Sequence, residues 1–269
     1  MQSLLDHEAA LRLAASLGVL LLMAAWERHA PRRPPGAARR WVRHLALAAL
    51  GALAVRLLLP LGTVALAALV QAHGGGLLPR LALPAPLAFG LTLLAFDLAL
   101  YAQHVASHRW AWFWRLHRLH HSDTAFDAGT ALRFHPLEIV VSMLWKLALI
   151  AALGPAPLAV LVYEVLLNAL ALFNHGNVRL PAALDRALRR VVVTPDMHRV
   201  HHSPYRDETD SNYGNALALW DRLFGTYRAQ PRDGHAGMRI GLDAFRDAAA
   251  QRLPALLAQP FAALPRGAR

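Results

Sequence analysis

Long, uninterrupted runs of apolar residues constrain this chain more than any other feature of its sequence. Five such runs stand at residues 9–26, 44–72, 81–103, 137–153 and 157–173. Most are long enough to cross the roughly 30 Å hydrocarbon core of a bilayer as a helix. The sequence therefore predicts an all-α integral membrane protein built as a bundle of about four to five transmembrane helices.

Two proline-containing sites shape the expected bundle. Pro60 interrupts the second run and is expected to kink it, because proline removes a helical hydrogen bond. The tetrapeptide at 154–157, Gly-Pro-Ala-Pro, separates the last two runs. Such a sequence is typical of a tight turn, so we predict a helical hairpin there.

The composition favours one membrane-embedded unit over the whole chain, residues 1–269. Hydrophobic residues make up 56% of it and charged residues only 17%, against roughly 25% charged residues in a soluble domain. The sequence has no cysteine. Disulfides, thiolate metal ligands and a cysteine nucleophile are therefore excluded.

The distribution of basic residues predicts the orientation in the membrane. The formal net charge is +11, but no basic helix with interleaved aromatic residues accompanies it, which argues against a nucleic-acid partner. The link at 27–43 is far richer in arginine than the link at 73–80. By the positive-inside rule the 27–43 link is cytoplasmic. Counting onward places the polar segments 104–136 and 175–269 on the cytoplasmic side as a helical cap.

Histidines gather in these two polar segments, beginning where the third apolar run ends at residue 103. Eight of the fifteen form three short clusters: His104 and His108 (HVASH), His117, His120 and His121 (HRLHH), and His198, His201 and His202 (HRVHH). Residues three or four apart share one face of a helix, so we expect each cluster to direct its imidazoles to one spot. Burying so many imidazoles without partners would be costly, which favours a metal site.

The number of clustered histidines predicts two metal ions rather than one. A zinc site takes about four ligands, and eight candidates exceed that number. His175 is a ninth candidate, because the fifth helix returns it to the same membrane face. His135 is a tenth, either as a ligand or as a residue that orients the helix start at Pro136. Imidazole ligands alone leave iron, zinc, copper and nickel open. The other histidines are interpreted as ordinary: His7, His29, His44, His73 and His235.

Charged residues inside the apolar runs also call for partners. Asp97 lies on the histidine-bearing face of the third helix, where its carboxylate would accept a hydrogen bond from a ligand imidazole or make a helix-packing contact. Lys146 and Glu164 lie at similar distances from the turn of the hairpin. We predict that they pair, since lone charges within a membrane are expensive.

Four further motifs, together with the histidine clusters, carry a family resemblance. They are RFHPLE (133–138), NHGNVRLP (174–181), TPDMHRVHHS (194–203) and NYGNALALWDRLFGTY (212–227). With these motifs the chain resembles the fatty acid hydroxylase/sterol desaturase superfamily, in the form of a bacterial integral membrane oxygenase. The resemblance is strongest between about residues 97 and 227.

The resemblance implies a cytosol-facing di-iron centre held by the eight clustered histidines and His175, with zinc as a substitute metal in purified protein. It implies O2 as co-substrate and a lipid C–H bond as the target, which is either hydroxylated or desaturated; we favour hydroxylation. The haem-binding sequence HPGG is absent, because Leu137 and Glu138 follow His135 and Pro136. A separate reductase or small redox carrier is therefore expected, and the location implied is the bacterial inner membrane.

One reading from another class stays open, a non-redox zinc protein acting as a hydrolase or a transporter. A transporter normally places its ligands near the middle of its spans, whereas these histidines fall at helix ends. A zinc hydrolase of the HExxH type is excluded because that motif is absent. The lipid itself is left open among fatty acyl chains, sterols or hopanoids, ether lipids, aminolipids and carotenoids.

Overall fold

The computed structural model describes residue 5 and residues 7–264, and this part of the chain is helical with only isolated β-bridges. Five of its helical segments are long and apolar enough to cross a membrane: Glu8–His29, Arg39–Arg80, Ala85–Arg109, Pro136–Leu153 and Pro157–Asn174. They correspond to the five apolar runs of the sequence. The predicted all-α membrane fold is therefore confirmed, and the chain is an integral membrane protein.

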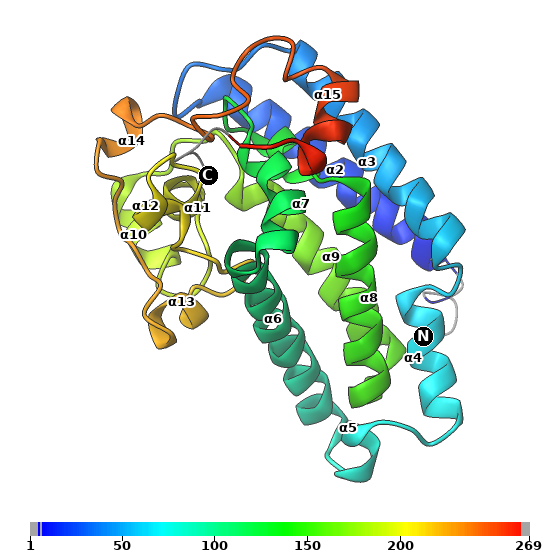
Figure 1. Ribbon diagram of the computed structural model, residues 1–269. Helices are drawn as coiled ribbons and strands as arrows, with labels where there is room; N and C mark the ends of the chain where they lie inside the picture. The colour runs from blue at the N-terminus through cyan, green and yellow to red at the C-terminus, as the bar shows by residue number, and fades with distance from the viewer. Residues whose placement is uncertain (1–4, 6, 265–269) are drawn as a thin grey trace.

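The helices follow one another in the order shown in Figure 1. Those of the membrane bundle are α2 (Glu8–His29), α3 (Arg39–Leu58), α4 (Thr63–Ala72), α5 (Leu77–Arg80), α6 (Ala85–Arg109), α8 (Pro136–Leu153) and α9 (Pro157–Asn174). Those outside it are α7 (Ala111–His121), α10 (Ala182–Leu188), α11 (Pro195–His201), α12 (Arg206–Thr209), α13 (Leu219–Leu223), α14 (Gly234–Gly237) and α15 (Leu253–Ala258). Two 3₁₀ turns complete the set, Ala128–Leu132 and Gln259–Phe261.

The second apolar run is broken rather than merely kinked. Helix α3 ends at Leu58 and α4 begins at Thr63, with Pro60 in the gap between them. Proline cannot donate a backbone hydrogen bond and also disfavours a helical conformation at the residue before it. Pro60 interrupts the run as expected, but by a break between two helices instead of the predicted kink, and Figure 1 shows α4 as a separate short helix below the end of α3.

Helices α8 and α9 form the predicted hairpin. Pro136 and Pro157 stand at the starts of the two helices, where the missing N–H costs nothing. Gly154 ends α8 in the left-handed conformation, with φ +61°. A Cβ added to Gly76 would lie 2.3 Å from the backbone nitrogen of Gly154. The two glycine turns therefore pack against each other in a way that no larger residue allows.

The predicted pairing of Lys146 with Glu164 is confirmed, and it is part of a larger cluster. The Lys146 Nζ atom lies 2.5 Å from Oε1 of Glu164. The second oxygen, Oε2, forms an ion pair with Arg12 of α2 and accepts a hydrogen bond of 2.7 Å from Thr63 of α4. One buried carboxylate thus joins four helices through charge-assisted hydrogen bonds.

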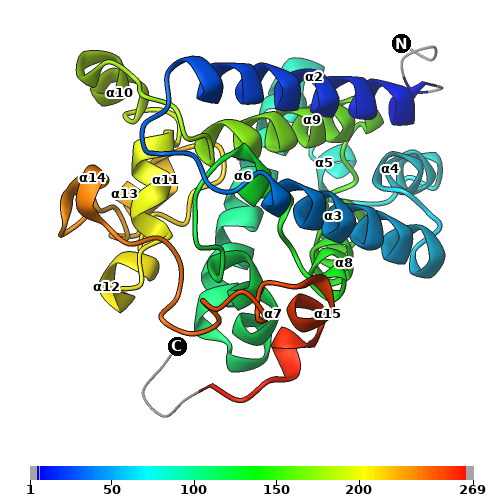
Figure 2. The ribbon, with the colours of Figure 1, turned by 90° about the horizontal axis from the view of Figure 1, so that it is seen from above.

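Helix α9 is the centre of the bundle. It packs against α2, α4 and α6, and Figure 2 shows α2 and α9 lying side by side. The side chains of Phe96, Ile150 and Val160 are fully buried in a cluster formed by α4, α6, α8 and α9. Leu21 and Leu57, on the outer faces of α2 and α3, are 70% and 71% exposed. Exposed leucines on a membrane helix are the surface that meets lipid tails.

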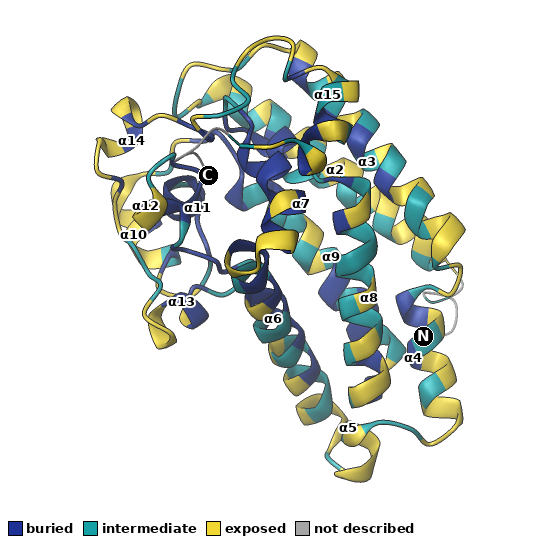
Figure 3. Ribbon diagram, viewed as in Figure 1, coloured by how far each residue is buried: buried dark blue, intermediate teal, exposed yellow. Residues whose placement is uncertain are grey.

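Buried residues concentrate where α6 ends and the smaller helices begin. Figure 3 shows them around α7, α11 and the upper part of α6, while the outer faces of α2 and α3 are largely exposed. Trp110, in an extended conformation, separates α6 from α7 and lets the chain change direction there. The helices outside the membrane bundle therefore enclose one end of α6, and that end carries the first histidines.

Candidate metal centre

Nine histidine side chains meet at the end of the bundle where α6 ends, and they form two groups. Within each group the ligand nitrogen atoms all lie within 4.8 Å of one another. The five-histidine group consists of His104, His108, His117, His121 and His201. The four-histidine group consists of His120, His175, His198 and His202. All are buried except His104, which is partly buried.

The structure corrects one expectation about the clusters, because each HxxHH cluster is divided between the two groups. In the first, His117 and His121 belong to the five-histidine group and His120 belongs to the other. In the second, only His201 belongs to the five-histidine group. Residues four apart share a helix face, but the adjacent histidine points about 100° away. An HxxHH helix lying between two sites therefore supplies both, and α7 and α11 each do so.

Hydrogen bonds to Nδ1 fix the orientation of several rings. The Nδ1 atoms of His104, His175 and His201 lie 2.8, 2.8 and 2.7 Å from the main-chain carbonyl oxygens of Tyr213, Ala171 and Ser211. A carbonyl oxygen can only accept, so each of these Nδ1 atoms carries the hydrogen. In a neutral imidazole the Nε2 atom is then left with a bare lone pair. That is the atom available to a metal.

The bare nitrogens face one another. The Nε2 atoms of His104 and His201 lie 3.0 Å apart, although both rings already donate through Nδ1. Two lone pairs at this distance repel unless a cation lies between them. In the four-histidine group, Nε2 of His175 lies 3.1 Å from Nε2 of both His120 and His198. The contact between His104 and His201 therefore calls for a positive charge between them, and His175 presents a bare nitrogen to the centre of the four-histidine group.

The spacing and protonation of the nitrogens fit transition-metal ligation. Two nitrogens bound at right angles to one ion at about 2.1 Å lie about 3.0 Å apart, which matches the observed contacts. Burial lowers the pKa of His117 and His175 to about 3, so both rings are neutral near neutral pH. Both ring nitrogens of His202 are buried without a hydrogen-bond partner in the part of the chain described. A neutral, unpartnered imidazole is a ready metal ligand.

His135 lies outside both groups, so its role as a ligand is not supported. Its Nδ1 atom accepts a hydrogen bond of 3.1 Å from the backbone nitrogen of Leu137 and caps α8. Its Nε2 atom lies 3.2 Å from the carbonyl oxygen of Leu257. The alternative expectation, that this residue orients the helix start at Pro136, describes what the structure shows.

Asp97 does not contact a histidine, and the expectation that it bonds a ligand imidazole is wrong. Its carboxylate accepts hydrogen bonds from the backbone nitrogens of Ala216 and Leu217, at 3.2 and 3.0 Å. It also accepts one from Nε1 of Trp220, at 2.8 Å. Asp97 therefore anchors the segment after Tyr213, whose carbonyl in turn orients His104.

Two carboxylates that the sequence analysis did not single out lie next to histidine rings of the five-histidine group. Oε1 of Glu138 lies 2.6 Å from Nδ1 of His117, and Oδ1 of Asp210 lies 3.4 Å from Nδ1 of His108. Glu138 lies in the RFHPLE motif, so the sequence did mark this residue as part of the family pattern. Its contact could not be read from spacing, because 21 residues separate it from His117.

Two histidines interpreted as ordinary are buried rather than solvated. Nε2 of His44 lies 3.3 Å from Oδ2 of Asp123, and Nε2 of His235 lies 3.6 Å from Oδ2 of Asp196. Neither belongs to a histidine group. Their positions agree with a structural role away from the two histidine groups.

A cavity of about 280 Å³ adjoins both histidine groups. Its lining includes His104 and His117 from one group and His120, His175 and His198 from the other. It continues between α6, α8 and α9 along apolar side chains that include Leu100, Ile139, Met143 and Leu167. The lining is therefore polar at the histidines and mainly apolar toward the interior of the membrane bundle.

Comparison with known proteins places this geometry in context. The family model described as fatty acid hydroxylase matches residues 89–226, which is just over half of the chain and includes all nine grouped histidines. The chain is 34% identical over 183 residues to the ornithine lipid hydroxylase OlsE of Rhizobium tropici, covering 65% of this chain and 51% of that protein. No solved structure matches it.

Two relatives of lower identity are named for other lipids. The chain is 31% identical over 142 residues to alkylglycerol monooxygenase of Homo sapiens, covering 51% of this chain and 30% of that protein. It is 28% identical over 143 residues to cholesterol 25-hydroxylase of Rattus norvegicus, covering 52% and 47%. The matched part thus spans about half or less of the length of each of these relatives.

Proposed function

This chain belongs to the fatty acid hydroxylase family, and from that premise we propose that it is a membrane lipid hydroxylase that uses two irons and O2. The observation that carries the proposal is the set of nine buried or partly buried histidines in two groups, with ring nitrogens 3.0–3.2 Å apart beside a largely apolar cavity. The relatives do not favour the alternative zinc hydrolase or transporter, since each is named for hydroxylation or oxygenation of a lipid.

The two histidine groups would each hold one iron. Nitrogen ligands without thiolates suit iron, and two adjacent sites suit a reaction that needs two electrons. When bound, the iron pair would supply the redox chemistry that reduces O2 and inserts one oxygen atom into a C–H bond. The chain itself holds the ions, orients the rings through Tyr213, Ser211, Ala171 and Glu138, and excludes water by burial.

The cavity between α6, α8 and α9 would receive the hydrocarbon part of the substrate. Its apolar wall lies within the spans, so a lipid tail can enter from the bilayer without crossing water. Gln103 and Ser142 bond each other at 2.9 Å within this wall, which leaves their polar atoms satisfied beside a hydrocarbon chain. We propose a lipid with a hydrocarbon chain as the substrate class, because the relatives are named for three different lipids.

The site would face the cytoplasm of a bacterial inner membrane. The arginine-rich link at 27–43 supports this orientation, and the structure places the start of α3 at the same end of the bundle as the histidines. Electrons would come from a separate reductase or small redox carrier on that side.

The test is metal analysis of protein purified without oxygen from iron-replete cells, combined with lipid profiling of cells with and without the gene. We expect two irons per chain, a spectroscopic signature of a coupled pair, and a lipid product heavier by one oxygen atom. Two zincs per chain, no oxygen uptake and an unchanged lipid profile would overturn the proposal.

A further inference from the structure

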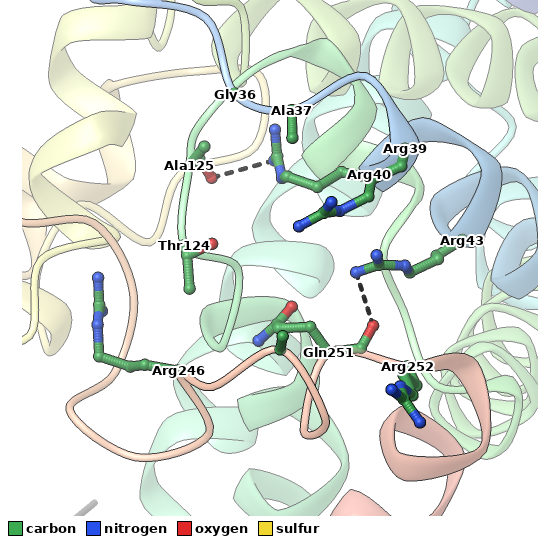
Figure 4. Close-up of a pocket in the computed structure, with 11 residues that line it drawn as sticks. Gly36, Ala37, Arg39, Arg40, Arg43, Thr124, Ala125, Arg246, Gln251 and Arg252 are labelled. Atoms are coloured by element: carbon green, nitrogen blue, oxygen red, sulfur yellow. Dashed lines mark hydrogen bonds between the residues drawn. The ribbon is translucent and has the colours of Figure 1, made fainter.

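A cavity lined by arginines lies at the start of α3, separate from the histidine groups. Its volume is about 590 Å³. Its polar lining consists mainly of Arg39, Arg40 and Arg43 of α3 and Arg246, Gln251 and Arg252 of the C-terminal segment. Figure 4 shows the α3 side chains on one side and the C-terminal residues opposite. We call this space the arginine cavity. No acidic residue lines it among the residues that the structure describes.

Only one of the five arginines has its charge balanced by carboxylates. Arg40 donates from Nε and Nη2 to Asp123, at 2.8 and 2.6 Å, and from Nη1 to Asp127, at 2.7 Å. Both carboxylates are therefore committed to Arg40 from outside the cavity. Two more acidic residues lie near in sequence but do not line the cavity. Asp243 pairs with Arg239 and also acts electrostatically on Arg246, and Asp247 accepts a hydrogen bond from the backbone of Ala250.

The other four guanidinium groups form no ion pair among the residues that the structure describes. Arg43 and Arg246 donate only to main-chain carbonyl oxygens, which satisfy hydrogen bonds without neutralising charge. Arg39 and Arg252 are exposed, and their side chains make no hydrogen bond or ion pair within residues 7–264. Four arginines without an ion-paired carboxylate around one space produce a positive potential that attracts an anion, and planar guanidinium groups match phosphate oxygens in geometry.

The arginine cavity lies at the membrane surface. Arg39 is the first residue of the second membrane span. Val42, three residues further and next to Arg39 on the helix surface, is 70% exposed, and Leu45 is 49% exposed. Leu53 and Leu57 continue this exposed apolar surface along α3. A positive cavity above an apolar helix face is the shape that a phospholipid fits, with its phosphate group above and its acyl chains below.

We propose that the arginine cavity binds the phosphate group of an anionic phospholipid whose acyl chains lie along the exposed face of α3. The bound headgroup would connect three parts of the chain. Arg39 and Arg43 belong to α3, and Gln251 donates from Nε2 to the carbonyl oxygen of Ser122 at 2.9 Å, in the turn that ends the histidine-bearing helix α7. Binding is therefore expected to stabilise the fold. Inorganic phosphate offers the same oxygen atoms, but it would leave the apolar surface of α3 unused.

The test uses purified full-length protein in neutral detergent micelles, titrated with dioctanoyl phosphatidylglycerol, dioctanoyl phosphatidylcholine or inorganic phosphate. Bound lipid is counted by native mass spectrometry and stability is followed by thermal unfolding. We expect one phosphatidylglycerol per chain and a raised Tm, with phosphatidylcholine and inorganic phosphate much weaker. In the double variant Arg39→Gln/Arg252→Gln the affinity for phosphatidylglycerol should fall about 30-fold. Each arginine near an anionic lipid headgroup contributes a factor of about five to six to the affinity, and the variant removes two of them.

The matched control is Arg186→Gln/Arg190→Gln, which removes two exposed arginines from α10 and the turn after it. This control should bind phosphatidylglycerol like the unchanged protein, and both double variants should keep their metal content. Equal affinity in the Arg39/Arg252 variant, or an equal loss in the control, would overturn the proposal. Tight binding of inorganic phosphate with the same dependence on Arg39 and Arg252 would overturn the assignment to a lipid.

Discussion

The two histidine groups differ in what holds their rings in place. In the five-histidine group, Nδ1 of three rings is hydrogen-bonded to an outer oxygen atom: His104, His117 and His201. Nδ1 of His108 lies 3.4 Å from Oδ1 of Asp210 without a hydrogen bond in the part of the chain described. In the four-histidine group only His175 has one, the carbonyl oxygen of Ala171. The Nδ1 atoms of its other three members are buried without a hydrogen-bond partner in the part of the chain described. Hydrogen bonds therefore orient most rings of the five-histidine group but only His175 in the four-histidine group.

Aromatic side chains replace those hydrogen bonds in the four-histidine group. The ring of Phe134 stacks on His120 with centroids 4.4 Å apart. Phe126 lies against His175 and His202, at 5.7 and 5.0 Å. Ring packing restricts orientation but leaves the nitrogen tautomer free, whereas a carbonyl partner fixes both. The difference suggests that the five-histidine group is formed before metal binds and that the four-histidine group depends more on its metal.

The largest effect is expected from removing one ligand of either group. His201→Ala and His120→Ala should each abolish lipid hydroxylation, by at least about 100-fold, since outer partners alone contribute about 10–100-fold. Metal analysis should show a loss of at least one ion per chain in both variants. Full activity in either variant would show that the two groups do not act as one centre.

A smaller loss is expected when the carboxylate that orients His117 is changed. Glu138→Gln keeps the shape and can still bond Nδ1, whereas Glu138→Ala removes the partner. Metal affinity or activity should fall about 10–100-fold in Glu138→Ala and less in Glu138→Gln. The comparison of the two variants by metal titration separates the hydrogen bond from the charge. Identical metal affinity and activity in Glu138→Ala and the unchanged protein would show that Glu138 does not orient His117 for metal binding.

The order of metal release tests the difference between the groups directly. During slow chelation, the ion of the four-histidine group should leave first, because fewer hydrogen bonds hold its ligands. Phe134→Leu removes the ring stacked on His120 and should speed this first step several-fold while leaving the second unchanged. Stopped-flow chelation with absorbance detection measures both steps. Simultaneous release of both ions would contradict the prediction that the four-histidine group holds its ion less firmly.

The smallest effect is expected at a histidine outside both groups. His235 lies beside Asp196 and away from the cavity, so His235→Ala should leave metal content and hydroxylation unchanged. Because the side chain is buried, a modest decrease in Tm is expected. A loss of metal in this variant would show that the two groups do not include all of the ligands.

Local patterns in the sequence predicted the histidines of the site, but they did not predict contacts between residues far apart in the sequence. The grouped histidines were recognisable because spacings of three and four place side chains on one helix face. Asp97 was assigned to a ligand because it shares that face, but its partners come from residues 216–220, far along the chain. Glu138 was passed over for the same reason. Spacing reports neighbours on one helix and carries no information about which distant segment packs against it.

What the sequence by itself determined is the membrane fold and which histidines gather at the site. Apolar runs must form helices in a bilayer, because unpaired backbone groups are too costly there, and so many clustered histidines have few uses other than metal binding. Only the tertiary structure decided how the ligands divide into two groups, which oxygens orient them, and that His135 caps a helix instead. Those outcomes depend on how helices from distant parts of the chain pack, and packing is set by the whole set of contacts at once.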